Sequence, residues 1–120
     1  MKTDNVILDK SKVFAIKIIN IYKRLCDSKK EYVLSKQLLR SGTSIGANIR
    51  EAIRGQSKAD FIHKMNISLK EASETEYWLE LLFAADYLTK DEYAHIYCEC
   101  QEITKILMAI VKTSRMDNSQ

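Results

Sequence analysis

Apolar residues recur at intervals of three and four along most of the chain, which places them on one face of an α-helix. The clearest stretch lies near the carboxyl end, where the apolar positions alternate in steps of four and three: Ile96, Cys100, Ile103, Leu107 and Ile110. This spacing is typical of a seam between packed helices.

The apolar stripe nearest the amino terminus is wider than one helix contact requires. Its main members recur at helical spacing: Phe14, Ile18, Ile21, Tyr22 and Leu25. Three further residues, Val13, Ile16 and Ile19, extend the stripe onto neighbouring positions. Because apolar surface beyond a bundle's own core favours association, this pattern predicts that the protein binds copies of itself.

Three capping boxes predict where helices begin. In this motif a Ser or Thr oxygen accepts a hydrogen bond from the amide three residues later, and an acidic side chain at that position reaches back. The pairs are Ser28 with Glu31, Ser57 with Asp60, and Thr89 with Glu92. Together with the apolar spacing they predict four helices, over about residues 9–26, 29–54, 58–87 and 90–115. We expect frayed ends at residues 1–6 and 116–120.

The composition predicts an all-α fold. The 120 residues include no proline and only three glycines, so little interrupts helix formation. Connections of only a few residues require successive helices to run antiparallel. We therefore predict a single domain over residues 1–120, built as an antiparallel up-down-up-down four-helix bundle.

The cysteines and the apolar runs indicate a cytoplasmic protein that does not enter a membrane. Three cysteines are an odd number and form no disulfide framework, so we expect free thiols. Charges interrupt every apolar run before it reaches the length of a membrane span, and the first residues lack the apolar stretch of a signal peptide.

The second predicted helix carries a basic ridge. The net charge of +3, from 19 Lys and Arg against 16 Asp and Glu, is too small to imply a polyanionic partner by itself. At about 100° per residue, however, one face of this helix contains four cations and no acid. The residues of this face are Lys36, Arg40, Thr43, Ala47, Arg50 and Arg54. Two interpretations stay open, a surface that binds nucleic-acid phosphates and an ordinary solvated face.

A polar stripe runs between this ridge and the core, with the residues Gln37, Ser41, Ser44, Asn48 and Glu51. The structural interpretation is hydrogen bonding to the third helix, for instance to Lys64. The alternative is a ligand or catalytic cleft, which is disfavoured because no strong nucleophile or base accompanies these groups. On the other flank, Gly42 and Gly46 permit close approach of a neighbouring helix.

No metal, cofactor or catalytic centre is predicted. Carboxylate-x-x-His pairs at 60–63 and 92–95 have the spacing used in di-iron bundles. They lie near the starts of consecutive antiparallel helices, however, so about 30 Å separates them along the bundle. Neither Cys26 nor Cys98 has an evident arrangement of histidine and acid that would make it a nucleophile.

The segment from Ser35 to Leu82 carries a specific order of residue types: Arg40, Ser41, Ser44, Ile45, Asn48, Ile49, Glu51, Ser57 and Phe61. In this order the chain resembles the bacterial four-helix-bundle family encoded by intervening sequences of 23S rRNA genes, whose relatives include the accessory protein of diversity-generating retroelements. Gly46 and Ala52 stand where many relatives have Pro and Gly. The resemblance implies a homo-oligomer, typically a pentamer with a positive surface, that binds nucleic acid or a nucleic-acid enzyme without catalysis.

These observations lead to two hypotheses on function. The first is a non-enzymatic oligomeric bundle that binds RNA or DNA through Lys36, Arg40, Arg50 and Arg54. The alternative is a protein-interaction scaffold, or an accessory subunit for a nucleic-acid enzyme such as a reverse transcriptase. Salt dependence separates the two, because phosphate contacts weaken steeply with added salt and an apolar contact does not.

Overall fold

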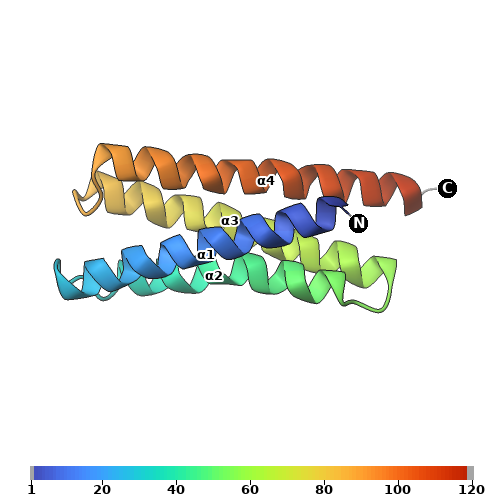
Figure 1. Cartoon of the computed structure of the whole chain (residues 1–120), viewed down its shortest axis with the longest axis horizontal. Helices are drawn as coiled ribbons and strands as arrows, with labels where there is room; N and C mark the ends of the chain where they lie inside the picture. Colours follow the sequence, from blue (N-terminus) through green and yellow to red (C-terminus); the bar gives the residue numbers. More distant parts are fainter. Residues whose placement is uncertain (1, 119–120) are drawn as a thin grey trace.

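The computed structural model describes residues 2–118, with side chains described for residues 5–116, as four α-helices. They are α1 (Lys2–Asp27), α2 (Leu34–Ile53), α3 (Lys58–Ala84) and α4 (Lys90–Asn118). Figure 1 shows all four lying along the long axis of a rod that measures 52 × 22 × 20 Å. Each helix packs against its neighbours in sequence, and α1 also packs against α4, which closes the bundle. The predicted all-α four-helix bundle is confirmed.

The core consists of the apolar stripes that the sequence pattern indicates. Its largest fully buried side chains come from all four helices: Ile7, Phe14, Ile18, Leu25, Leu38, Ile45, Ile49, Met65, Leu79, Leu82, Ile103 and Leu107. Burying one such side chain contributes about 1.5–3 kcal/mol, so this row supplies most of the force that holds the helices together.

The N-cap hydrogen bond of two of the three predicted capping boxes is confirmed, whereas the Glu92 carboxylate pairs with Arg24 of α1. The Ser57 hydroxyl accepts a hydrogen bond from the Asp60 amide at 3.0 Å, and α3 begins at the next residue, Lys58. In the same way the Thr89 hydroxyl accepts from the Glu92 amide at 3.2 Å ahead of α4. These two starts agree with the sequence because the caps are local and need no partner from elsewhere in the chain.

The predicted start of the second helix at residue 29 is wrong, because α2 begins at Leu34. Ser28 lies in the turn that follows α1, and the backbone of Lys30 has a positive φ of 56°, which no helix accommodates. The carboxylate of Glu31 does the capping instead, since its oxygens accept hydrogen bonds from the amides of residues 33–35 at 3.1, 2.9 and 2.7 Å.

The outer ends of the bundle also differ from the sequence prediction. Helix α1 begins at Lys2 instead of residue 9, since Ile7 is fully buried and holds its first turns on the core. Helix α4 continues to Asn118, through positions expected to fray. Helix α3 ends at Ala84 instead of residue 87, because Asp86 has a φ of 67° and the Tyr87 amide turns back to the Leu82 carbonyl at 2.8 Å.

The capping role of Glu31 makes the stability of the bundle sensitive to pH. Partial burial acts to raise the pKa of its carboxyl, but the three backbone hydrogen bonds outweigh this and hold the pKa below the ordinary 4.5. A lowered pKa in the folded state stabilises the protein at pH values above 4.5, and this contribution disappears as the pH falls through the folded pKa. We expect Glu31→Gln to reduce the free energy of unfolding by about 1 kcal/mol at pH 7.

Urea denaturation followed by circular dichroism checks this expectation at neutral and at acidic pH. The difference between wild type and Glu31→Gln should shrink at acidic pH, where the wild-type carboxyl is protonated too. A difference that stays constant with pH would contradict the charged cap.

The two glycines of α2 face α1, as the sequence suggested. A Cβ added at Gly42 would lie 2.9 Å from the Ile18 Cγ2 atom, whereas one at Gly46 would lie 3.1 Å from the Ser11 hydroxyl. Ile18 is fully buried and would have to shift to admit the new methyl group, so Gly42→Ala should lower the free energy of unfolding by about 1–3 kcal/mol. For Gly46→Ala the gain in helix propensity, about 1 kcal/mol, offsets much of the crowding.

Paired urea titrations of the two variants measure this difference. Gly46→Ala serves as the matched control, since both substitutions add one methyl group to the same flank of the same helix. Equal denaturation midpoints would show that close packing of α1 on α2 does not constrain the bundle.

Candidate nucleic-acid interface

The basic ridge predicted on α2 is divided among three directions in the folded protein. Lys36 and Arg54 are exposed on the outer side of the helix. Arg40 instead reaches toward α3, and Arg50 lines a groove against α1. The four cations therefore do not form one continuous row, although all of them lie on or beside the outer surface of α2.

Arg40 forms ion pairs with two carboxylates of α3. Its guanidinium donates a hydrogen bond to Glu74 and lies 3.7 Å from the Glu71 Oε1 atom. Trp78 supports this arrangement, since its indole N–H donates to the same Glu74 carboxylate at 3.4 Å. The ridge lacks acids within α2, but the packing of α3 supplies them. Arg40 is consequently less available to a phosphate than its position along α2 suggests.

Glu71 is a largely buried carboxylate on this face, with its side chain 18% exposed. Its Oε1 atom is buried and has no hydrogen-bond partner among the described residues. Burial raises the pKa of the Glu71 carboxyl, and the neighbouring Glu74 adds to this effect while the Arg40 guanidinium opposes it. Arg40 is held in place because its departure would leave this carboxylate without its counter-charge.

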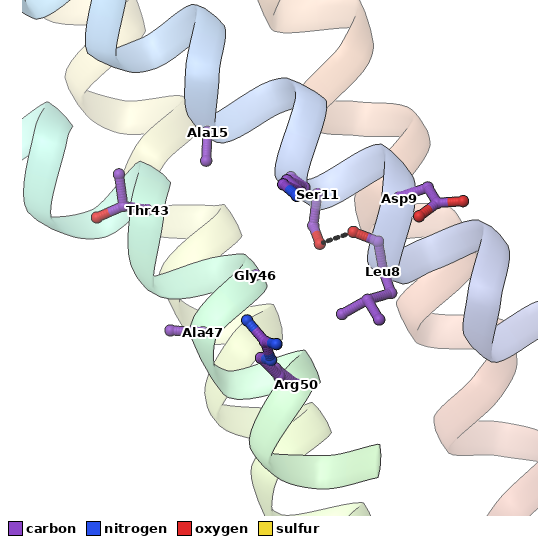
Figure 2. Close-up of a pocket in the computed structure, with 9 residues that line it drawn as sticks. Leu8, Asp9, Ser11, Ala15, Thr43, Gly46, Ala47 and Arg50 are labelled. Carbon is purple, nitrogen blue, oxygen red and sulfur yellow. Dashed lines mark hydrogen bonds between the residues drawn. The ribbon is translucent and has the colours of Figure 1, made fainter. Parts of the chain in front are cut away.

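A groove of about 330 Å³ runs between α1 and α2. The small residues Ala15, Gly46 and Ala47 and the side chain of Arg50 line it, and Figure 2 shows Ala15 of α1 and Gly46 of α2 on the facing sides of the two helices. Lys12 lines the α1 side of the same groove. The groove also contains one acid, Asp9, which forms no ion pair with either cation among the described side chains. The groove thus brings together two cations that are far apart in sequence.

The polar stripe of α2 is mostly engaged in hydrogen bonds inside the bundle. The Thr75 hydroxyl donates to Ser41 at 2.9 Å, and the Ser44 hydroxyl donates to its own helix at 2.6 Å. The Asn48 amide donates to the Ser44 carbonyl at 2.8 Å, so it bonds within α2 and not to the third helix. Lys64 lies 3.9 Å from Glu51, the pairing that the sequence suggested. These contacts favour the structural interpretation over a ligand cleft.

Three other cations of α1 are paired with α4. Three contacts recur at seven-residue spacing along α1: Lys10 with Glu102 at 3.2 Å, Lys17 with Glu99, and Arg24 with Glu92. Each pair is partly exposed, so each contributes at most about 1 kcal/mol. Their main effect is on the surface, because they neutralise the flank of α1 that faces α4.

Most of the cations left without an ion pair lie at the α1–α2 side of the bundle, and the others are Lys70, Lys90, Lys105 and Lys112 on α3 and α4. No carboxylate with a described side chain lies within ion-pair distance of these exposed residues: Lys12, Lys23, Lys29, Lys30, Lys36, Arg50 and Arg54. Residues 1–54 carry 12 Lys and Arg against 5 Asp and Glu, a net +7, whereas residues 55–120 carry 7 against 11, a net −4. The small net charge of the chain thus conceals a basic half and an acidic half.

Four of these cations were missed by the sequence analysis: Lys12, Lys23, Lys29 and Lys30. The signal for them is the unequal charge of the two halves of the chain, which a count along the sequence reveals. Which individual cations remain unpaired depends on the packing of α1 against α4 and is not visible in that count.

The rest of the described surface offers little chemistry. No group of three or more His, Cys, Asp and Glu residues that could hold a metal ion occurs within the described part of the chain. The Cys100 thiol is buried against the Ala72 carbonyl, and burial raises its pKa to about 12. No helix among the described residues is long and apolar enough to cross a membrane.

Comparisons with known proteins agree with the resemblance seen in the sequence. A family model described as 23S rRNA-intervening sequence protein matches residues 3–109. A crystal structure from Bacteroides thetaiotaomicron VPI-5482, described as a protein with unknown function from the S23 ribosomal protein family, shares 59% sequence identity with this chain. The two structures superpose with a TM-score of 0.91, and the matched region covers 92% of this chain and 98% of the Bacteroides chain. A search of curated proteins found no match.

Proposed function

Since the chain belongs to the 23S rRNA-intervening sequence protein family, we propose that it is a non-enzymatic, cytoplasmic bundle that forms oligomers and binds nucleic acid through its basic half. The observation that carries this proposal is the concentration of unpaired cations on the α1–α2 side, which has a net charge of +7. Lysine and arginine neutralise backbone phosphates and release counterions whatever the base sequence, so such a surface binds RNA or DNA without requiring a base-specific pocket.

Three of the four ridge cations are the main contributors to phosphate binding in this proposal. Lys36, Arg50 and Arg54 are exposed and form no ion pair with any described side chain. Arg40 contributes less, because binding a phosphate would require it to leave Glu71 and Glu74. A competing intramolecular carboxylate reduces the gain from each new phosphate contact by the strength of the contact that it replaces.

Reversing the three unpaired charges tests the proposal. In the variant Lys36→Glu, Arg50→Glu, Arg54→Glu, affinity for a labelled oligonucleotide should fall by at least about 100-fold at low salt. The slope of log affinity against log salt should fall in magnitude by about 2–3, since each phosphate contact contributes about 0.9 for a duplex and 0.7 for a single strand. Fluorescence anisotropy at two ionic strengths measures both quantities, and circular dichroism checks that the helices persist.

Two control variants make this test specific. Lys70→Glu, Lys105→Glu, Lys112→Glu changes the net charge equally, but its exposed residues lie on α3 and α4. It should retain most of the affinity, as should Arg40→Gln. An equal loss in the α3–α4 control would mean that total charge, and not the basic half, determines binding.

Self-association is supported by an exposed apolar stripe on α1. Val13, Ile16 and Ile19 remain 53%, 50% and 36% exposed after the bundle has formed. The partner that we propose is a second copy, because the basic half that carries the stripe and the acidic half with a net −4 are electrostatically complementary. The family resemblance implies a pentamer. The same stripe is the basis of the second candidate function, docking as an accessory subunit on a nucleic-acid enzyme such as a reverse transcriptase.

Replacing Ile16 by Glu should dissociate the oligomer, because the charge would be buried at the contact between copies. Size-exclusion chromatography with light scattering gives the mass of the wild type and of the variant. Val33→Glu is the matched control, since Val33 is 72% exposed but lies in the α1–α2 turn at the end of the bundle. A monomeric wild type would refute self-association and leave the stripe to another protein.

A further inference from the structure

Six of the seven unpaired cations of the α1–α2 side form two separate patches, and the seventh, Lys23, lies on α1 one turn before its end at Asp27. The first patch consists of Lys29, Lys30 and Lys36, at the end of the bundle where α1 turns into α2. The second patch consists of Lys12, Arg50 and Arg54, around the groove and the carboxyl end of α2. Figure 1 shows these two ends of α2 at opposite ends of the rod. Lys36 and Arg50 are fourteen residues apart on one helix, which corresponds to about 21 Å.

Along α2, the surface between the patches has no available cation among the described side chains. Residues 37–49 include one charged side chain, Arg40, and it is paired with Glu71 and Glu74 of α3. The middle of α1 is equally occupied, because Lys17 pairs with Glu99 of α4. The remaining outward positions of α2 are small or uncharged, for instance Thr43 and Ala47.

The acids closest to the patches do not cancel them. Glu31 beside the first patch is occupied by the amides of α2, and Glu51 beside the second patch lies 3.9 Å from Lys64. Asp9 lines the groove of the second patch, and Asp27 precedes Lys29 of the first patch by two residues. Neither acid forms an ion pair with a described side chain, so each patch carries a net charge of about two instead of three.

From this arrangement we propose that the protein binds a nucleic-acid duplex by bridging its two strands, one patch on each phosphate backbone. The proposal rests on the nucleic-acid binding proposed above and specifies the form of its ligand. The separation of about 21 Å exceeds the width of a B-form major groove, about 12 Å, by roughly the thickness of the two backbones that border it. The uncharged middle of α2 then lies over the open groove.

A single strand fits this surface poorly. Single-stranded sites combine a continuous row of cations with aromatic side chains on which the bases stack. Here the row is interrupted, and residues 34–57 contain no aromatic side chain, with only Tyr32 exposed beside the first patch. A duplex keeps its bases stacked inside and offers phosphates alone, which is what two cationic patches recognise.

Fluorescence anisotropy with four labelled probes of one 20-base sequence tests the bridge: a DNA duplex, an RNA duplex, single-stranded DNA and single-stranded RNA. The wild type should bind at least one duplex about tenfold or more tightly than either single strand. Comparing the affinities for the DNA and RNA duplexes then shows which of the two duplexes the protein prefers. Comparable binding to single strands and duplexes would overturn the bridge and leave the proposed function intact. Absence of binding to all four probes at low salt would overturn both.

A duplex with one uncharged strand provides the sharper test. In a hybrid of DNA with peptide nucleic acid only one strand carries phosphates, so one patch should lose its ligand. Binding to the hybrid should fall by about 10–100-fold relative to the DNA duplex. Equal affinity for both would contradict contacts to two strands.

Two variants that remove equal charge locate the contacts. Lys29→Gln, Lys30→Gln, Lys36→Gln neutralises the first patch, and Lys12→Gln, Arg50→Gln, Arg54→Gln neutralises the second. Each should weaken binding to the DNA duplex by about 10–100-fold and have much less effect on the hybrid, where only one patch is engaged. The control Lys70→Gln, Lys105→Gln, Lys112→Gln should change neither affinity by more than about twofold. A loss confined to one patch variant would overturn the bridge.

Discussion

The close contact between α1 and α2 is the constraint on which the surface of this bundle depends. Because Gly42 has no side chain, the α2 backbone lies against Ile18, whose nearest atoms would be only 2.9 Å from an added Cβ. The second glycine of the same flank, Gly46, lies against Ser11 and lines the groove between the two helices. Lys12 and Arg50 therefore line one groove, while the opposite flank of α1 faces α4. A residue with a larger side chain at position 42 would push the two helices apart. It would thereby change both the groove between α1 and α2 and the contact of α1 with α4.

The rotation of α1 and α2 also sorts the cations into engaged and available ones. Lys10, Lys17 and Arg24 recur every seven residues and meet acids of α4, whereas Lys12 and Lys23 point to other sides of the same helix. On α2 the same sorting separates Arg40, held by Glu71 and Glu74, from its neighbours along the ridge. Individually these pairs add little stability, because they are partly exposed. Collectively they determine which positive charges a polyanion can reach.

Much of the fold could be predicted from the sequence, because its signals are local. The seam of Ile96 and Ile103 and the caps at Ser57 and Thr89 each depend on residues within one helical turn. Predictions failed where a distant or unusual contact decides. Glu31, and not Ser28, caps α2, since the turn at Lys30 adopts a positive φ that the sequence does not announce. The extent of α1 toward its amino terminus depends on Ile7 reaching a core that only the assembled bundle provides.

The candidate site was predicted less completely than the fold, for a related reason. The angular position of Arg40 on α2 follows from helix geometry, but the acids that meet it belong to α3 and depend on the register between the two helices. Lys12 enters the site only through the groove that Gly46 helps to form. Local sequence patterns can place a side chain on a face, whereas its electrostatic partner is a property of the packed structure.

The division into a basic and an acidic half links the two proposed activities physically. Copies that meet through the apolar stripe of α1 would neutralise part of each acidic half and leave α2, the adjacent helix, at the outside. Every copy would then contribute two cationic patches to one assembly, and the first contact with a polyanion would raise the effective concentration of the others. A net charge of +3 per chain is consequently a poor measure of affinity. The quantities that matter are the number of unpaired cations per copy and the spacing that the helices impose on them.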